Sequence, residues 1–277
     1  FIVVLNLPNL LKRVYAEGAI SQTIIPSMSQ SHESRKDDAY FLSILVGSLS
    51  FILFIVVAVL ILFSPFFISV LAPGFTQVSE KLSLSTTLFR LIAPYIAFIM
   101  LAGVYGAFLN KKHIFGVPAA TPILLNLTLI TVLLLAGYHT TIVYWLVIGV
   151  TFSGLLQMGV LARSAYKYTE WRTPKIRLND PMVKRVLFGL LPTIIVVSVI
   201  YIGFFIDILF ASGLATGNVS WLYYSERLVV LPISLIGGAI AVALLPRITE
   251  ASQVVKKQQM QKALAAVFWL GIPATLG

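Results

Sequence analysis

Residues 7–22 have the sequence LPNLLKRVYAEGAISQ, and this stretch decides the fold. It has the apolar density of a membrane helix, yet it contains Lys12, Arg13 and Glu17. Each charge at bilayer depth costs about 2.5–3.5 kcal/mol on insertion scales, so these three side chains should not face lipid. We therefore expect them to line a polar cavity whose walls are formed by the rest of the chain.

The spacing of the three charges predicts different roles for them. Arg13 and Glu17 are four residues apart and share a helix face, whereas Lys12 is turned about 100° away from Arg13. One hypothesis is that Glu17 neutralises Arg13 and leaves Lys12 to meet an outside anion. The alternative is that Lys12 and Arg13 snorkel to a membrane interface. Pro8 also permits a broken helix, which membranes tolerate where the backbone lines a cavity.

The composition is that of a polytopic membrane protein. The 277 residues are 58% hydrophobic and 11% charged, whereas soluble domains carry about 25% charged residues. The sequence has no cysteine, which excludes disulfides, thiol catalysis and cysteine metal sites within it. Its three histidines have no metal-binding spacing. Because it begins at Phe1 and ends inside an apolar run at Gly277, we expect it to be a fragment.

Apolar runs predict seven membrane spans and the start of an eighth. Pro94 predicts a kink in the third span. The third span is expected to stop at residues 110–113, and a turn at residues 137–141 should divide the long uncharged run of 114–162. The predicted spans are 1–25, 40–71, 82–110, two within 114–162, 186–213 and 219–246.

Lysine and arginine are distributed unevenly between the loops. The loops after the first, third, fifth and seventh spans carry fifteen of the 20 basic residues, seven of them in a basic loop at about 163–185. The alternate loops carry essentially Lys81 alone. The positive-inside rule therefore places the basic loops in the cytoplasm and the turns at 72–81, 137–141 and 214–218 outside. Because the loops explain most of the net charge of +10, no nucleic-acid partner is expected.

A polar stripe in the seventh span is the second candidate site. Arg227 shares a helix face with Ser220, Tyr223 and Tyr224, and this combination suits sugars or phosphate. The alternative is an aromatic belt at the membrane interface. Glu226 is adjacent in sequence and could balance charge between helices. Arg90 lies near the predicted outer end of its span, so we set it aside as an interfacial residue.

Asp207 stands alone in apolar sequence, with Gly203 and Ala211 four residues on either side. A lone acid in a membrane span is protonated, paired with a cation of another helix, or a cation ligand. Both a structural ion pair and a coupling site for a proton or a monovalent cation remain open.

The sequence contains no catalytic constellation. It has no phosphate-binding glycine loop with lysine, no histidine–carboxylate arrangement and no nucleophile elbow. We therefore expect no enzyme. Prolines and glycines within the spans, together with cations at depth, favour a transporter of anionic cargo.

Four stretches resemble the MurJ/MviN family of lipid II flippases. Residues 7–22 are similar to the family signature, usually PNLLRRLFAEGAFSQ. Residues 93–95 with 106–110 resemble its PY…GA.LN segment, and residues 118–126 resemble PA.APTLLN. Residues 219–228, followed by 231–232 and 244–246, resemble VSWMYYADRL…LP…LLP. The four matches occur in the family's order along nearly the whole chain.

The resemblance implies an all-α exporter fold of the multidrug/oligosaccharidyl-lipid/polysaccharide (MOP, MATE-like) class, in which two helical lobes surround a cavity. Residues 1–213 would then be helices of the N-terminal lobe, and residues 214–277 the start of the C-terminal lobe. The implied cargo is lipid II, a polyprenyl pyrophosphate that carries a disaccharide-peptide. The implied location is the bacterial cytoplasmic membrane, where the protein would contact membrane lipids, most simply as a monomer without a cofactor.

The resemblance also assigns roles to individual residues. It places substrate binding on Lys12, Arg13, Glu17 and Arg227, and the polar stripe adds Ser220 and Tyr223. Lys12 stands where the family usually has arginine, and lysine cannot grip phosphate bidentately. Glu226 replaces the usual aspartate. Asp207 lies where some members carry an acid tied to Na⁺ or H⁺ binding, so a cation gradient or the membrane potential would reset the transporter.

Two alternatives to lipid II transport remain. One is a sister exporter of the same fold, either an O-antigen-type flippase or a drug/cation antiporter. The other is a membrane scaffold that does not transport, in which the charges merely pair between helices.

Overall fold

The computed structural model describes residues 3–5, 35–136, 141–170, 172–215, 217–228 and 230. The chain divides into two compact units, Phe1–Leu214 and Ala215–Gly277. This division falls one residue from the expected boundary between 213 and 214. The assignment of the two units to the two lobes of a transporter stays a prediction.

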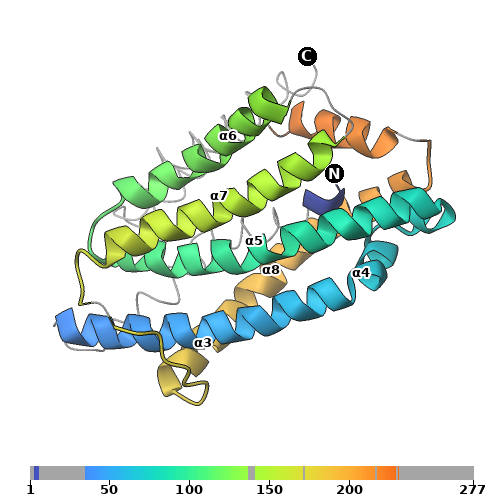
Figure 1. Ribbon diagram of the computed structural model, residues 1–277. Helices are drawn as coiled ribbons and strands as arrows, with labels where there is room; N and C mark the ends of the chain where they lie inside the picture. The colour runs from blue at the N-terminus through green and yellow to red at the C-terminus, as the bar shows by residue number, and fades with distance from the viewer. Residues whose placement is uncertain are drawn as a thin grey trace, which may run out of the picture. The chain divides into compact units, whose positions relative to one another are not determined.

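The described secondary structure of the first unit is helical throughout (Figure 1). Helices α3, α5, α6 and α7 are long and apolar enough to cross a membrane. The expected class, an all-α polytopic membrane protein, is therefore confirmed. The elements are α3 (Arg35–Leu62), α4 (Ser64–Leu71), the 3-10 turn η1 (Pro73–Gln77), α5 (Ser79–Lys111), α6 (Gly116–Ala136), α7 (Ile142–Ala165) and α8 (Pro181–Ser212).

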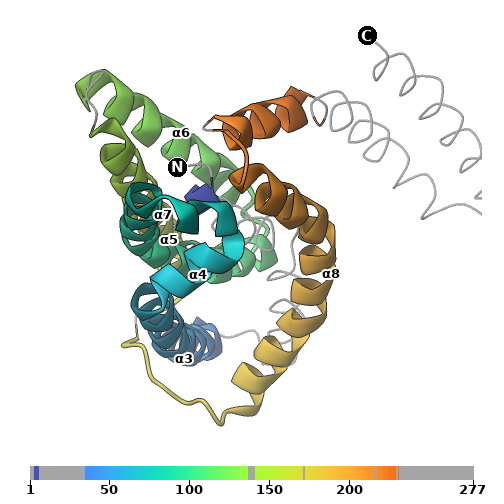
Figure 2. The same ribbon diagram turned by 90° about the vertical axis from the view of Figure 1, so that its right-hand side faces the viewer.

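Four long helices lie side by side in the order α6, α7, α5, α3 (Figures 1 and 2). Helix α5 packs against both α7 and α3, and most of its residues between Leu88 and Leu109 are buried. Helix α6 packs mainly on α7 and has one buried residue, Thr121. Most of its large exposed side chains, such as Leu127 and Leu134, are as apolar as lipid tails, which is typical of a lipid-facing surface.

The run at 40–71 was expected to form one span, and it contains one candidate span, α3, which ends earlier than residue 71. Helix α3 ends at Leu62, Phe63 departs from helical geometry (φ −95°, ψ 19°), and α4 begins at Ser64. Pro65 explains the interruption, because it has no N–H to donate to the carbonyl of Ile61 and its ring crowds that carbonyl. The hydroxyl of Ser64 donates to the Ile61 carbonyl instead, at 2.8 Å.

In α6 a side-chain hydroxyl again donates to the carbonyl that a proline leaves unpaired. Pro122 cannot donate to the carbonyl of Pro118, and the hydroxyl of Thr121 donates to it at 2.8 Å. Helix α5 is continuous through Pro94, whose missing N–H would have paired with the carbonyl of Arg90. The hydroxyl of Thr151 reaches across from α7 to the next carbonyl, that of Leu91, at 2.8 Å. Such hydroxyls satisfy backbone groups that find no water inside a bilayer.

Two helix ends follow from local sequence. Helix α5 stops at the predicted place, where His113 adopts a left-handed conformation (φ 60°) and the amide of Ile114 donates to the carbonyl of Leu109 at 2.9 Å, as in a Schellman motif. Helix α8 begins at residue 181 rather than the expected 186, because the carboxylate of Asp180 caps it by accepting from the amide of Met182 at 3.0 Å.

Polar contacts between helix ends agree with the predicted alternation of sides. The amide of Gly74 donates to the hydroxyl of Ser212 at 3.1 Å, which joins two turns that are both expected outside. A Cβ at Gly74 would collide with the carbonyl of Ser212, so this approach requires glycine. Asp38, at the start of α3, lies beside the lysines at the end of α5, and both ends are expected in the cytoplasm.

The basic loop folds back onto α3, a feature that its charge alone did not predict. The amide of Lys175 donates to the carbonyl of Ser43, and the amide of Arg177 to the hydroxyl of Ser48, both at 2.9 Å. The guanidinium of Arg177 also donates to the hydroxyl of Tyr40 at 2.9 Å. A Cβ at Gly47 would lie 2.5 Å from the carbonyl oxygen of Lys175, so glycine lets the loop backbone lie directly on the helix.

Candidate functional site

Arg227 and Tyr223 form a cationic pair in the helical residues 218–228 of the second unit. One guanidinium nitrogen of Arg227, Nη2, donates to the Tyr223 hydroxyl at 2.7 Å, and the guanidinium carbon lies 5.0 Å from the centre of the ring. The four-residue spacing places both side chains on one helix face. Arg227 is exposed, and the tyrosine takes only one of its five N–H donors. The pair therefore presents an oriented cation to an anionic ligand.

The helix that carries this pair begins at a glycine turn. Gly217 has a φ of 110°, and its carbonyl accepts from the amide of Ser220 at 2.8 Å. Ser220 lies one turn before Tyr223 and is half-buried, and its hydroxyl forms no hydrogen bond with the described residues. Tyr224 packs edge to face on Tyr223, and both Tyr224 and Trp221 are largely exposed. These exposed rings suit an interfacial belt as well as a ligand site.

The two acids of the predicted site are both exposed. Glu226 is next to Arg227 on the helix. Asp207 lies near the end of α8, where Gly203 leaves open space on one side and Ala211 is a small buried residue on the other. Asp207 forms no ion pair with any residue in the described ranges, so an ion pair with another helix and a role as a cation ligand both stay open.

Lys12, Arg13 and Glu17 lie outside the described residues, as does most of the first predicted span. Their assignment to substrate binding stays a prediction.

Arg90 of α5 has a defined partner, although the sequence analysis set it aside. Its Nε donates to the hydroxyl of Ser64 at 2.7 Å, and that hydroxyl in turn donates to the carbonyl of Ile61. Ser64 is buried, whereas Arg90 is exposed. The sequence offered one signal for this contact, the Ser-Pro pair inside an apolar run, but the two partners are 26 residues apart.

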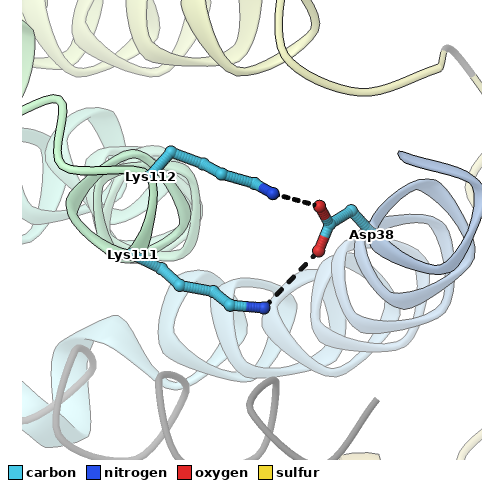
Figure 3. A network of polar contacts seen from close by, with 3 residues as sticks. All are labelled: Asp38, Lys111 and Lys112. Carbon is cyan, nitrogen blue, oxygen red and sulfur yellow. Dashed lines mark ion pairs between the residues drawn. The ribbon is translucent and has the colours of Figure 1, made fainter. Parts of the chain in front are cut away.

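A second charged cluster joins α3 to α5 (Figure 3). The carboxylate of Asp38 is 1% exposed and lies between two ammonium groups, Lys112 Nζ at 2.6 Å from Oδ2 and Lys111 Nζ at 3.6 Å from Oδ1. Lys112 approaches Oδ2 without the alignment of a hydrogen bond, so the contact is electrostatic. Because the carboxylate is neutralised from both sides, we assign this cluster to packing between the two helices.

Two cavities lined by described residues of α6 and α7 are apolar and suit neither phosphate nor a metal. Their volumes are about 360 and 510 Å³, and no charged residue lines either of them. No group of three metal-ligating side chains occurs in the part of the chain that the structure describes. Within that part, Arg90, Arg177 and Arg227 each have a guanidinium held by a hydrogen bond to a hydroxyl, an arrangement suited to an anion.

The sequence model of the MurJ lipid II flippase family matches residues 1–277. The chain belongs to this family. It is 32% identical over 247 residues to the probable lipid II flippase MurJ of Buchnera aphidicola subsp. Acyrthosiphon pisum, covering 88% of this chain and 48% of that protein. It is 34% identical over 262 residues to the lipid II flippase MurJ of Burkholderia cenocepacia, covering 91% of this chain and 50% of that protein. The chain thus spans about half the length of the curated MurJ relatives it matches.

The fold is that of a solved MurJ structure as well. The match to a lipid II flippase MurJ in an inward closed conformation has a TM-score of 0.83 and 24% sequence identity, covering 98% of this chain and 56% of that one. This similarity supports the fold, and the expected exporter-type helical architecture is confirmed. As a member of the MurJ family with several helices able to span a membrane, the chain is a multi-pass protein of the bacterial cytoplasmic membrane.

Proposed function

We propose that this chain forms part of a flippase that moves lipid II from the cytoplasmic to the outer leaflet, and that it acts as a transporter rather than as an enzyme. The observation that carries the proposal is the exposed Arg227, fixed by Tyr223, in a chain that belongs to the MurJ family. Of the two relatives that support it, one is named a lipid II flippase and the other a probable lipid II flippase.

The cargo explains why cations are needed. A pyrophosphate must exchange its hydration for protein donors when it enters a membrane cavity, and arginine offers it a planar, bidentate fork. Arg227 has N–H groups that do not bond to Tyr223 and that can make this contact. In our proposal, Lys12 and Arg13 meet the same pyrophosphate, while Glu17 balances the charge of Arg13. Ser220 and Tyr223 add hydroxyls that suit a sugar or a phosphate oxygen.

The proposed mechanism is alternating access. The headgroup enters from the cytoplasmic leaflet and meets the cations, and the two lobes then rock so that the cavity opens outward. The polyprenyl tail stays in lipid throughout. Because the pyrophosphate is screened by protein cations while the tail never leaves hydrocarbon, no step exposes a charge to lipid.

Coupling to the membrane potential or to a monovalent cation would reset the transporter. Moving one charge through 100 mV is worth about 2.3 kcal/mol. Asp207 is the candidate for proton or Na⁺ coupling, because it is an exposed carboxylate in an apolar helix segment. Charge balance is the role proposed for Glu226.

The runner-up is a sister exporter of the same fold. An antiporter of organic cations should have an acidic cavity. Apart from the interfacial Arg90, the charges within the predicted spans are three basic residues and three acidic ones, which is not the acidic cavity of a cation antiporter. They are Lys12, Arg13 and Arg227, against Glu17, Asp207 and Glu226.

Binding of lipid II to the purified full-length protein tests this proposal. We expect the unmodified protein to retain lipid II and Arg227→Ala to lose most of it. Arg163→Ala is the matched control, because Arg163 is an exposed arginine in the last turn of α7 and is not one of the residues assigned to the candidate site. Equal retention of lipid II by all three proteins would contradict the assignment of Arg227.

A further inference from the structure

We propose that Arg90 is a second phosphate-binding group, which receives the pyrophosphate of the lipid-linked cargo at the outer end of the transport path. This inference rests on the proposed function and adds a subsite to it. It follows from how Arg90 is held, where it lies along α5 and what shares its face of the helix.

The guanidinium of Arg90 is held from one side. Its Nε donates to the Ser64 hydroxyl, which is itself fixed by its bond to the Ile61 carbonyl. This contact leaves the two terminal nitrogens without a hydrogen bond to any described residue. A guanidinium that is held through Nε, with its two terminal nitrogens available, has the geometry for bidentate phosphate binding.

The position of Arg90 along the helix places it at the outer boundary of the membrane. Lys111 is 21 residues further on, which corresponds to about 31 Å along the helix axis. The hydrocarbon core is about 30 Å thick. Because the lysines at the end of α5 are expected in the cytoplasm, Arg90 lies where a headgroup would leave the protein.

The surroundings of Arg90 on α5 are polar. Ser83 and Thr87 precede it by seven and three residues, so all three lie on one face, and all three are exposed. The large exposed side chains of α6 are isoleucine and leucine, as expected for a surface that faces lipid, and Asn126 and Thr131 are its exposed polar residues. A face with two hydroxyls and a cation is better suited to water and a headgroup than to acyl chains.

Arg90 would therefore act late in the cycle, after the inner cations. In this proposal, Arg90 offers the departing phosphate a second oriented guanidinium. Bulk phospholipid offers the same phosphate chemistry at this depth, so the experiment must separate the two sources.

The test uses the full-length protein with two measurements, retention of lipid II by purified protein and outer-leaflet lipid II in cells depleted of their own flippase. We expect Arg90→Gln to retain lipid II, because the inner cations remain. We also expect it to lower outer-leaflet lipid II per inserted molecule by about tenfold, the fold-change of one lost charged hydrogen bond. Arg90→Lys should give an intermediate loss, because it keeps the charge without the fork.

Two further variants serve as controls. Ser64→Ala should impair transport less than Arg90→Gln, because it loosens the guanidinium without removing it. Lys81→Gln removes a cation from the same end of α5, about half a turn around the axis, and should leave transport unchanged.

Three results would overturn the role of Arg90. Normal transport by Arg90→Gln would show that Arg90 does not bind the cargo. Equal losses of transport in Arg90→Gln and Ser64→Ala would show that Arg90 only holds α4 in place. Reduced membrane insertion with normal transport per molecule would show that Arg90 anchors bulk phospholipid. Failure of the unmodified protein to retain lipid II is a separate result, and it would refute the proposed function itself.

Discussion

The hydroxyl of Thr121 donates to the carbonyl of Pro118, and this is the carbonyl that Pro122 leaves without its helical partner. Ser64 does the same for Ile61 ahead of Pro65. In both cases the residue before the proline supplies the donor that the proline lacks. A membrane helix needs such a donor, because an unpaired carbonyl inside a bilayer finds no water.

Thr121→Val should therefore destabilise the protein. The substitution keeps the shape of the side chain but leaves the Pro118 carbonyl unpaired, at a cost of about 1–3 kcal/mol. Thr131→Val is the matched control, because the Leu127 carbonyl that Thr131 contacts is within hydrogen-bonding reach of the helix's own amides. Denaturant unfolding in detergent would measure both variants. Equal losses in the two would refute the compensation argument.

Gly47→Ala and Gly159→Ala should change stability in opposite directions. A Cβ at Gly47 would strike the backbone of Lys175, so we expect a loss of about 1–3 kcal/mol from overpacking. Gly159 of α7 has nothing within 4 Å of its added Cβ, so alanine there should add up to about 1 kcal/mol through helix propensity. Thermal unfolding would measure both effects. A stable Gly47→Ala variant would mean that the basic loop does not lie on α3.

Asp38→Asn should weaken the packing of α3 on α5. The substitution leaves Lys111 and Lys112 at the interface between the two helices without the carboxylate that they share, so we expect a loss of about 1–3 kcal/mol. The additional substitution Lys112→Gln should recover part of this loss, because it removes one of the stranded charges. A double-mutant cycle would measure the coupling. Strictly additive losses would show that the pair is not coupled.

Tyr223→Phe should lower the affinity for lipid II by about two- to tenfold. The ring still supports the guanidinium of Arg227, but one hydrogen bond worth about 0.5–1.5 kcal/mol is lost. Tyr223→Leu removes the ring as well and should cost more. Tyr224→Phe is the control, because Tyr224 is exposed and its hydroxyl makes no hydrogen bond among the described residues. The idea that Tyr223 orients Arg227 fails if Tyr223→Phe and Tyr224→Phe bind lipid II equally well.

The sequence predicted those features that depend on many residues at once. Membrane class follows from composition, the alternation of sides follows from fifteen loop cations, and the end of α5 follows from a polar segment at 110–113. Features that depend on single contacts were missed. The mean hydropathy of residues 40–71 does not depend on the one backbone N–H that Pro65 lacks. It therefore could not predict that the helix breaks at Phe63.

The candidate site shows the same contrast. The spacing of Tyr223 and Arg227 is local, so the sequence could predict that they meet, and the structure confirms their contact. Arg90 and Ser64 belong to different helices, so no helical spacing in the sequence predicts their contact. The docking of the basic loop depends on Gly47, and a lone glycine is too common in membrane helices to signal a contact.

Complementation with the full-length gene tests the central claim most directly. Bacteria depleted of their own flippase would receive the unmodified gene, Arg227→Ala, or the control Arg163→Ala as the sole copy, and growth, membrane insertion and outer-leaflet lipid II would be measured together. We predict that the unmodified gene and Arg163→Ala restore growth and outer-leaflet lipid II, and that Arg227→Ala inserts normally but restores neither. Normal growth and normal outer-leaflet lipid II with Arg227→Ala as the sole copy would contradict the account.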